Sequence, residues 1–326
     1  MKAFRHIVSI VFAAMLIGCN AIPDQPHTVR HCASLPDGGR ACATCFVVNG
    51  KGYLFGGRDA DQECRNDLWC YDPKSDSWTD LGETPLHPRV NATACVHDGK
   101  VYMGLGFNGK YGNDTSYLRD YWQLDPKTMT WTQLSSYPNT YTDCATSFAG
   151  DGELLVGYGF CWRYRRDMFR YDIATDHWDS IDVHVSGMGY PIRSFGGTGC
   201  TCGGRHLMGT GYYRVSLNWW AELLPEGRWV KRAEVPGRTR TLAASAATDR
   251  YIYLCGGVHY GGVNTCGEVL QDLLRYDPEA DSWVRVAVLP SPMMNHVCFT
   301  IGRTVYFGMG EDADVKLISD LYCIEE

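Results

Sequence analysis

The sequence has no basic excess, no long apolar run and no long helical heptad. Its 326 residues carry a formal charge of −7, from 30 Lys and Arg against 37 Asp and Glu. Without surplus positive charge a chain does not displace counterions from phosphates, which argues against a nucleic-acid partner. The apolar run at residues 7–17 is 11 residues long, too short to cross a bilayer as a helix.

Motifs of common enzyme classes are missing too. The chain contains no HExxH, no GxSxG, no phosphate-binding GxxxxGK[ST] loop and no EF-hand loop. Cys42 and Cys45 lie three apart in a predicted strand, where they face opposite sides, and Cys200 and Cys202 have no second Cys or His pair nearby. We therefore predict no metal site and no cofactor.

The first 19 residues resemble a bacterial lipoprotein leader. Two basic residues precede the apolar run, which leads into LIGC at 16–19, a match to the lipobox. In that family the cysteine is lipidated and becomes the first mature residue. We expect a signal peptide at 1–19 with lipidation at Cys19, and a tether at 20–27. The resemblance implies export and anchoring to a bacterial membrane, the outer rather than the inner one, facing the periplasm or the cell surface.

Fourteen cysteines follow Cys19, and an exported chain with so many permits disulfides. Their connectivity is not fixed by the spacing, although Cys255 with Cys266 and Cys64 with Cys70 lie close in sequence. An anaerobic habitat would leave many of them as thiols.

One sequence pattern recurs along the chain. The stretch NDLWCYDPKSDSW at 66–78 returns in similar form at 120–131, 167–178 and 272–283. Repetition with a period of about fifty residues predicts a repeat architecture. Six glycine pairs and five tryptophans follow this spacing: Gly56/Gly57, Gly104/Gly106, Gly157/Gly159, Gly209/Gly211, Gly256/Gly257 and Gly308/Gly310, with Trp78, Trp131, Trp178, Trp229 and Trp283.

Each repeat is predicted to form a four-stranded antiparallel meander. In the first, an apolar run meets the hairpin turn NGK at 49–51, and the second strand ends at the glycine pair. The last repeat lacks a fourth strand, and residues 28–36 resemble the missing one. We therefore predict an all-β, six-bladed β-propeller over residues 28–326, closed by pairing of the N-terminal strand with the C-terminal blade.

These residues resemble the kelch repeat, in which a glycine pair ends strand two, a tyrosine lies in strand three and a tryptophan in strand four. The resemblance covers residues 28–326 and implies a propeller fold, which hosts many functions. The fourth repeat departs from the pattern, because Glu222 stands in place of the tyrosine and the Asp-Pro turn is lost. We interpret the glycine, tyrosine and tryptophan positions as structural.

The longer loops share one face of the predicted propeller, termed the loop face below. Aligned repeats place Arg40, Arg89 and Arg240 at the start of strand one, with Arg193 one residue away. If these guanidinium groups point toward the central opening, they would bind a carboxylate, phosphate or sulfate. The alternative is that each arginine pairs with a carboxylate of a neighbouring blade and only holds the blades together.

Aromatic residues of the same loops extend the predicted ligand site. Aromatic faces mixed with Gly, Asn and Arg suit sugar rings, and they equally suit a protein partner. The candidate ligand-binding residues besides the arginines are Trp162, Tyr164, Tyr212, Tyr213, His259 and Tyr260.

Three functions fit these features. The first is a membrane-tethered propeller that binds an acidic carbohydrate, a neutral glycan or another anionic ligand. The second follows from a resemblance to the six-bladed bacterial sialate mutarotases, a family that uses a carboxylate and an arginine in the central cleft. It implies a mutarotase or epimerase with Glu268 and Arg240 as catalytic pair, Glu63 and Glu311 being further candidates by loop position. The third is a protein–protein interaction scaffold.

Copper chemistry resembling that of galactose-oxidase-like kelch proteins is not expected. Those proteins have seven blades and a ring of Tyr, His and Cys ligands. His259 and His296 are too few to form such a ring.

Overall fold

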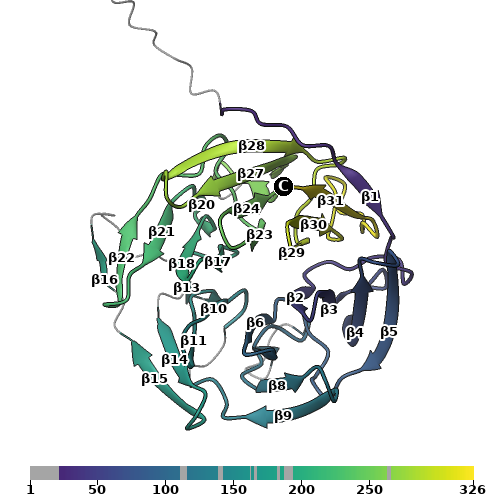
Figure 1. The fold of residues 1–326 in the computed structure, drawn as a ribbon, viewed down its shortest axis with the longest axis vertical. Coiled ribbons are helices and arrows are strands. Elements are labelled where there is room, and N and C mark those ends of the chain that lie inside the picture. The colour runs from purple at the N-terminus through teal and green to yellow at the C-terminus, as the bar shows by residue number, and fades with distance from the viewer. Residues whose placement is uncertain are drawn as a thin grey trace, which may run out of the picture.

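The computed structural model describes residues 22–110, 116–138, 142–161, 163–164, 167–181, 184–186, 194–262 and 266–326. This part of the chain forms 31 β-strands and no α-helix. It therefore offers no helix that is long and apolar enough to span a membrane. Six sheets stand as blades around a central axis (Figure 1), so the predicted six-bladed propeller is confirmed.

Within a blade, the strands follow one another from the axis outward. Blade six departs from this order because its outer strand comes from the N-terminal end of the chain, and blade four because an extra outer strand precedes its inner strand in sequence. The blades are β2 (Thr44–Val48), β3 (Lys51–Arg58), β4 (Cys64–Asp72), β5 (Ser77–Glu83); β6 (Thr93–His97), β7 (Lys100–Gly104), β8 (Tyr121–Asp125), β9 (Thr130–Leu134); β10 (Thr146–Ala149), β11 (Glu153–Gly157), β14 (Met168–Asp172), β15 (His177–Ile181); β17 (Thr198–Cys202), β18 (Arg205–Gly209), β21 (Trp220–Leu223), β22 (Arg228–Lys231); β23 (Ala244–Ala247), β24 (Ile252–Cys255), β27 (Asp272–Asp277), β28 (Ser282–Val288); and β29 (Val297–Ile301), β30 (Thr304–Gly308), β31 (Leu321–Glu325), β1 (Arg30–Cys32).

The hairpin turns follow from local sequence. Val48 pairs with Lys51 across Asn49 and Gly50, whose φ angles are 54° and 71°. Asparagine and glycine tolerate this left-handed conformation, so the NG dipeptide makes the tight turn that the sequence predicts.

Tyrosine and tryptophan side chains fill the wedges between blades. Tyr71 packs against Trp78 of its own blade and Tyr306 of blade six, with ring centroids 5.1 and 5.4 Å apart. The Trp78 indole N–H also donates to the carbonyl of Ala33, just after β1 (2.9 Å). Trp178 and Trp283 make the equivalent bond to the preceding blade. The repeated aromatic residues thus tie each of these blades to its neighbour.

Blade four replaces the tyrosine by an ion cluster. Glu222 is buried, and its carboxylate accepts hydrogen bonds from Arg205 (2.7 and 2.5 Å) and Arg232 (2.8 Å). Burial alone would raise the pKa of Glu222, but the two guanidinium groups lower it. This blade also gains an outer parallel strand, β16 (His184–Ser186). Its sheet is complete despite the lost repeat residues.

The N-terminal segment lies along two blades. Residues 22–27, within the predicted tether, run beside β28, where Asp24 forms a bidentate ion pair with Arg285 (2.6 and 2.7 Å; Figure 1). The chain then enters β1, which pairs antiparallel with β31. The described part of the predicted tether is therefore held on the propeller.

The cysteine side chains that the structure describes are all free thiols. Cys255, Cys266, Cys64 and Cys70 are among them, so neither pair that is close in sequence is bridged.

Candidate functional site

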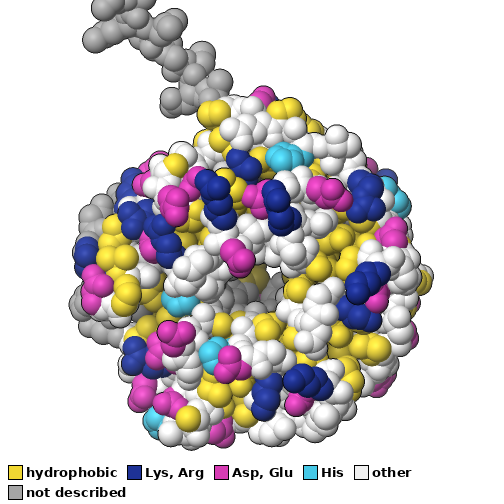
Figure 2. Space-filling model, viewed as in Figure 1, with side chains coloured by type: hydrophobic (Ala, Val, Ile, Leu, Met, Phe, Trp, Pro, Cys, Tyr) yellow, Lys and Arg dark blue, Asp and Glu magenta, His cyan; other side chains and the backbone are white. Residues whose placement is uncertain are grey.

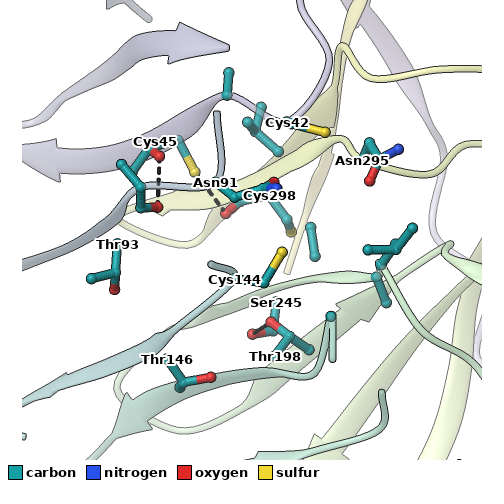
Figure 3. A pocket seen from close by; sticks show the side chains of 18 of the residues that line it. Cys42, Cys45, Asn91, Thr93, Cys144, Thr146, Thr198, Ser245, Asn295 and Cys298 are labelled. Carbon is teal, nitrogen blue, oxygen red and sulfur yellow. Dashed lines mark hydrogen bonds between the residues drawn. The ribbon is translucent and has the colours of Figure 1, made fainter. Parts of the chain in front are cut away.

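The six inner strands enclose a central channel. Figure 2 shows its opening in the middle of the disc, with charged side chains of both signs around it. A cavity of about 220 Å³ is lined by four residues from each blade, most of them Ala, Gly, Ser, Thr or Cys (Figure 3): 42–45, 91–94, 144–147, 196–199, 242–245 and 295–298.

Hydroxyl groups of this wall are used largely between blades. Thr44 Oγ1 donates to the carbonyl of Ala92 (2.7 Å), and Thr93 Oγ1 donates to Ser147 Oγ (2.6 Å). Such bonds hold neighbouring inner strands together. The groups that are placed to meet a ligand therefore lie toward the mouth of the channel on the loop face.

The mouth is a ring of residues with left-handed backbone, one from each blade. Backbone hydrogen bonds join successive members, as from Asn91 N to Cys42 O (2.9 Å) and from Cys42 N to Asn295 O (2.8 Å). Non-glycine residues adopt this conformation at a cost of about 1 kcal/mol or more, and such strain clusters at functional sites. The ring consists of Cys42, Asn91, Cys144, Gly196, Leu242 and Asn295, with φ between 53° and 61°.

The predicted arginines do not line this mouth. Arg40, Arg89 and Arg240 have fully buried side chains. Arg89 contacts both oxygens of Asp120 (2.8 and 2.7 Å), and Arg240 contacts both oxygens of Asp272 (2.7 and 2.9 Å). Their Nη atoms already contact carboxylates of the chain. The Nε atoms of Arg40 and Arg240 have no partner within the described chain, but these side chains have no exposed surface for a ligand to meet.

The same arginines connect blades through their backbone. Arg40 pairs with Asp37 and Asp67 by its side chain, while its carbonyl accepts the Gly310 N–H of blade six (2.7 Å). Arg89 and Arg240 accept equivalent bonds from the preceding blade. The predicted pairing with a carboxylate of a neighbouring blade is therefore wrong for Arg89 and Arg240, which pair within their own blade. Arg40 pairs with Asp67 of its blade and with Asp37 of the segment between β1 and β2. Arg193 lies outside the described residues.

A different arginine reaches the mouth. Arg58 ends β3, and its Nη2 lies 2.5 Å from Oε1 of the buried Glu311, whose Oε2 accepts a bond from Asn295 Nδ2 (2.8 Å). The Arg58 side chain is 32% exposed, and its buried Nε has no hydrogen-bond partner within the described chain. Burial and then Glu311 raise the pKa of the Cys42 thiol to about 12, while Arg58 opposes them. The charges of Arg58 and Glu311 therefore affect the pKa of Cys42, which lines the channel.

A second carboxyl group lies at the same mouth. Asp143 precedes Cys144 in the ring, and its Oδ1 accepts the Cys144 N–H (3.0 Å). Burial raises the pKa of Asp143 to about 7, although hydrogen bonds from Asn91 and Cys144 oppose the shift. The mouth thus combines an ion-paired carboxylate with a carboxyl group that titrates near neutral pH.

The predicted aromatic residues are only partly brought together. Tyr212 meets Tyr260 edge-on, with centroids 5.8 Å apart, and Glu311 contributes to the raised pKa of Tyr260 after burial and Tyr212. Tyr213, the residue after Tyr212 in the same short strand, is exposed. Trp162 and the side chain of Tyr164 lie outside the described residues.

The structure does not bring the predicted catalytic pair together. Glu268 lies exposed on the hairpin of β25 (Val258–His259) and β26 (Glu268–Val269), 3.2 Å from Arg238, whereas Arg240 is buried against Asp272. An exposed carboxylate lacks the enclosed surroundings that acid–base catalysis uses. His259, on the same hairpin, bonds to Thr239 Oγ1 (2.8 Å).

Sequence reasoning named Glu311 only by loop position and missed Arg58, Asp143 and the ring asparagines. One signal was available, because Arg58 and Glu311 each directly follow the glycine pair of their repeat. The other four repeats carry Phe, Phe, Tyr and Val there. Within the described chain, no group of three or more His, Cys, Asp and Glu residues is arranged to hold a metal ion.

Comparisons with known proteins agree with this fold. The profile of the KLHDC2/KLHL20/DRC7 Kelch-repeats domain matches residues 25–211, more than half of the chain, and the Kelch motif matches residues 239–289. N-acetylneuraminate epimerase of Shigella sonnei is 30% identical over 110 residues, 33% of this chain and 28% of that protein.

Two vertebrate proteins match over longer stretches. Mouse Kelch-like protein 35 is 25% identical over 68% of this chain and 35% of its own length. Kelch-like protein 23 of Pongo abelii is 24% identical over 82% of this chain and 45% of its own length. The chain thus spans less than half the length of each of these three relatives.

Proposed function

Because the chain belongs to the kelch-repeat family, we propose that it binds an acidic carbohydrate at the loop-face mouth of its channel. The observation that carries this is Arg58, a partly exposed guanidinium beside the channel with a buried N–H that lacks a partner. Guanidinium groups bind carboxylates through several parallel donors. Asn91 and Asn295 add side-chain amides in the cavity wall, and Tyr260 adds an aromatic edge.

The remaining contacts fit this recognition. Glu311 holds one Nη of Arg58 in place, so the guanidinium is oriented before a ligand arrives. Drug-sized ligands occupy pockets of roughly 300–1,000 Å³. A cavity of about 220 Å³ is smaller, so we propose that it admits one sugar unit or the end of a chain rather than a long oligosaccharide.

Proton NMR of N-acetylneuraminate with the purified protein tests this proposal. We expect ligand lines to broaden, and the broadening to fall sharply for the methyl ester, which lacks the negative charge. Arg58→Gln should abolish the broadening, whereas Arg285→Gln, at an exposed ion pair far along the sequence, should keep it. Unchanged lines for every acidic sugar would reject the proposal.

A second function, exchange of sugar anomers, is favoured by Asp143. A protonated carboxyl group can give its proton to the ring oxygen while its other oxygen takes the proton of the anomeric hydroxyl. The ring C–O bond then breaks, a carbonyl forms and the carboxyl stays neutral, and reversal from the other face of the carbonyl gives the second anomer. The similarity to proteins named N-acetylneuraminate epimerase supports this second function.

The same NMR sample separates binding from exchange. Accelerated anomer exchange that weakens as the pH rises through about 7, where Asp143 loses its proton, would support this second function. Asp143→Asn should remove the exchange and keep the line broadening. Broadening without exchange in the unmodified protein would leave a sugar-binding protein.

A protein partner is the third candidate. The hairpin of β19 (Tyr212–Tyr213) and β20 (Val215–Ser216) exposes Tyr213 and Val215, with Arg214 5.8 Å from the Tyr213 ring centre. Tyrosine and arginine are enriched at protein interfaces. Indifference to all sugars would favour this candidate.

Export and lipid anchoring are proposed on the N-terminal sequence alone. Cys19 lies outside the described residues. In a bacterial host, incorporation of labelled palmitate that is lost in Cys19→Ser would support anchoring, and equal labelling of both chains would contradict it.

A further inference from the structure

Two buried thiols meet where the two ends of the propeller chain pair. Cys32 is the last residue of β1, and Cys323 is the central residue of β31. Their Sγ atoms are 3.4 Å apart, although 291 positions separate the residues in sequence. Because Cys32 pairs with Leu321, Cys323 is its diagonal neighbour on the same face of the sheet.

We propose that Cys32 and Cys323 form a disulfide bond that fastens the N-terminal strand to the C-terminal blade. A disulfide has an S–S length of about 2.0 Å, so the two sulfurs need to approach by roughly 1.4 Å. β1 is a three-residue outer strand with two exposed residues, so it has room to make this adjustment. Among the described cysteines, Cys32 and Cys323 are the pair whose thiols are hydrogen-bonded to each other.

The surroundings favour reaction at this pair. The hydrogen bond between the Cys32 and Cys323 thiols lowers the pKa of Cys32 against the opposing effect of burial, and the charge of Arg30 adds to the lowering. The thiolate is the form that attacks disulfides. Cys323 also lines a surface hollow with Thr28, Arg30 and Glu325. Because both thiols are buried, the short outer strand β1 has to move before a small disulfide reaches them.

The oxidant is a small disulfide of the glutathione class. One protein thiolate attacks its S–S bond, forms a mixed disulfide and releases one glutathione thiolate, which takes up a proton. The second protein thiol loses its proton and attacks the protein sulfur of the mixed disulfide, releasing the second glutathione. Each cysteine sulfur is oxidised by one electron, and the glutathione disulfide gains both.

The consequence is a covalent closure of the propeller. The bond would enclose nearly the whole folded chain in one loop, which removes more entropy from the unfolded state than a short loop does. It would also prevent the short strand β1 from leaving the edge of blade six, which protects that edge.

Peptide mapping of the full chain tests the proposal. The protein is equilibrated with oxidised glutathione, and its remaining thiols are alkylated before digestion without reductant. We expect a linked peptide that joins Cys32 to Cys323, and a melting temperature roughly 5 °C higher than in dithiothreitol. Alkylation of both residues, or their linkage to other cysteines, would overturn the proposal.

Two variants complete this test. Cys323→Ser should lose both the linked peptide and the redox-dependent rise in melting temperature. Cys202→Ser should keep both, because Cys202 is equally buried but its thiol donates to a backbone carbonyl. If Cys323→Ser fails to fold, the linked peptide of the unmodified chain still decides the question. A rise in melting temperature that persists in folded Cys323→Ser would contradict the proposal.

Discussion

Two kinds of arginine–carboxylate pair occur around the channel, and they differ in what remains available. Arg240 is fully buried inside blade five, and both of its Nη atoms contact Asp272. Arg58 joins blade one to Glu311 of blade six, uses Nη2 in that pair and stays one third exposed. The same chemical pair is fully enclosed in one place and partly exposed in the other, where we propose that it binds an anion.

The difference lies in position within the blade rather than in residue type. The start of strand one is enclosed by the aspartate before strand three, as Asp120 encloses Arg89. Arg58, directly after the glycine pair of its repeat, meets Glu311 of blade six, which in turn is bonded to Asn295 of the channel wall. The Arg58 side chain stays partly exposed there.

The largest expected effect is on folding, from Arg240→Ala. It leaves Asp272 without its partner in a mostly enclosed site, so the free energy of unfolding should fall by about 3–5 kcal/mol. Urea denaturation measures this. Arg285→Ala is the matched control, because Arg285 also contacts both oxygens of an aspartate, Asp24, but at the surface, and it should change stability little. A small loss in Arg240→Ala would show that the buried pair is not a structural clamp.

Asp143 is an enclosed carboxyl group that has no arginine partner among the described residues, which makes it a useful third case. Its pKa is about 7 in the folded protein against 3.8 as the unperturbed value. Between these values the folded state holds a proton that the unfolded state lacks, so stability falls as the pH rises. The expected slope is about 1.4 kcal/mol per pH unit.

Asp143→Asn should remove this slope, which denaturation between pH 4 and about 7 measures in both proteins. Identical pH profiles would mean that the Asp143 carboxyl group is not enclosed as described.

Arg58→Gln is expected to weaken binding of an acidic sugar roughly 10- to 100-fold, because hydrogen bonds to a charged group contribute about 1.5–3 kcal/mol. Its stability should change less than that of Arg240→Ala, since the Arg58 side chain is partly exposed. Isothermal titration gives the affinity and denaturation the stability. If Arg58→Gln lowered stability more than Arg240→Ala does, Arg58 would be the structural clamp and our assignment of the two arginines would be wrong.

The smallest effect is expected from Glu268→Gln. Glu268 is exposed beside Arg238, so sugar affinity should stay within about twofold. A tenfold loss of sugar affinity in the same titration would show that Glu268 contributes to ligand binding.

The repeats made the fold predictable because their signals are local. Glycine pairs, the NG turn and Trp78 each act within about fifty residues, so counting them gives the blades. Even blade four follows from spacing, although its Glu222 cluster with Arg205 and Arg232 could not be read from a lost tyrosine.

The site was less predictable because its parts come from distant repeats. Aligning the repeats shows that Arg89 and Asp120 each occupy a recurring position. It does not show that their side chains form an ion pair and that Arg89 is buried instead of facing the channel. Arg58 and Glu311 are 253 positions apart and meet only because blade one adjoins blade six. The raised pKa of Asp143 depends on burial, which no single repeat reveals.

The most direct test of the central claim compares N-acetylneuraminate with its methyl ester in the unmodified protein and in Arg58→Gln. If Arg58 recognises the ligand carboxylate, the unmodified protein prefers the acid and the variant binds both forms with equal, weak affinity. If the variant stays folded and keeps the preference for the acid, another group recognises the anion and the proposed role of Arg58 is wrong.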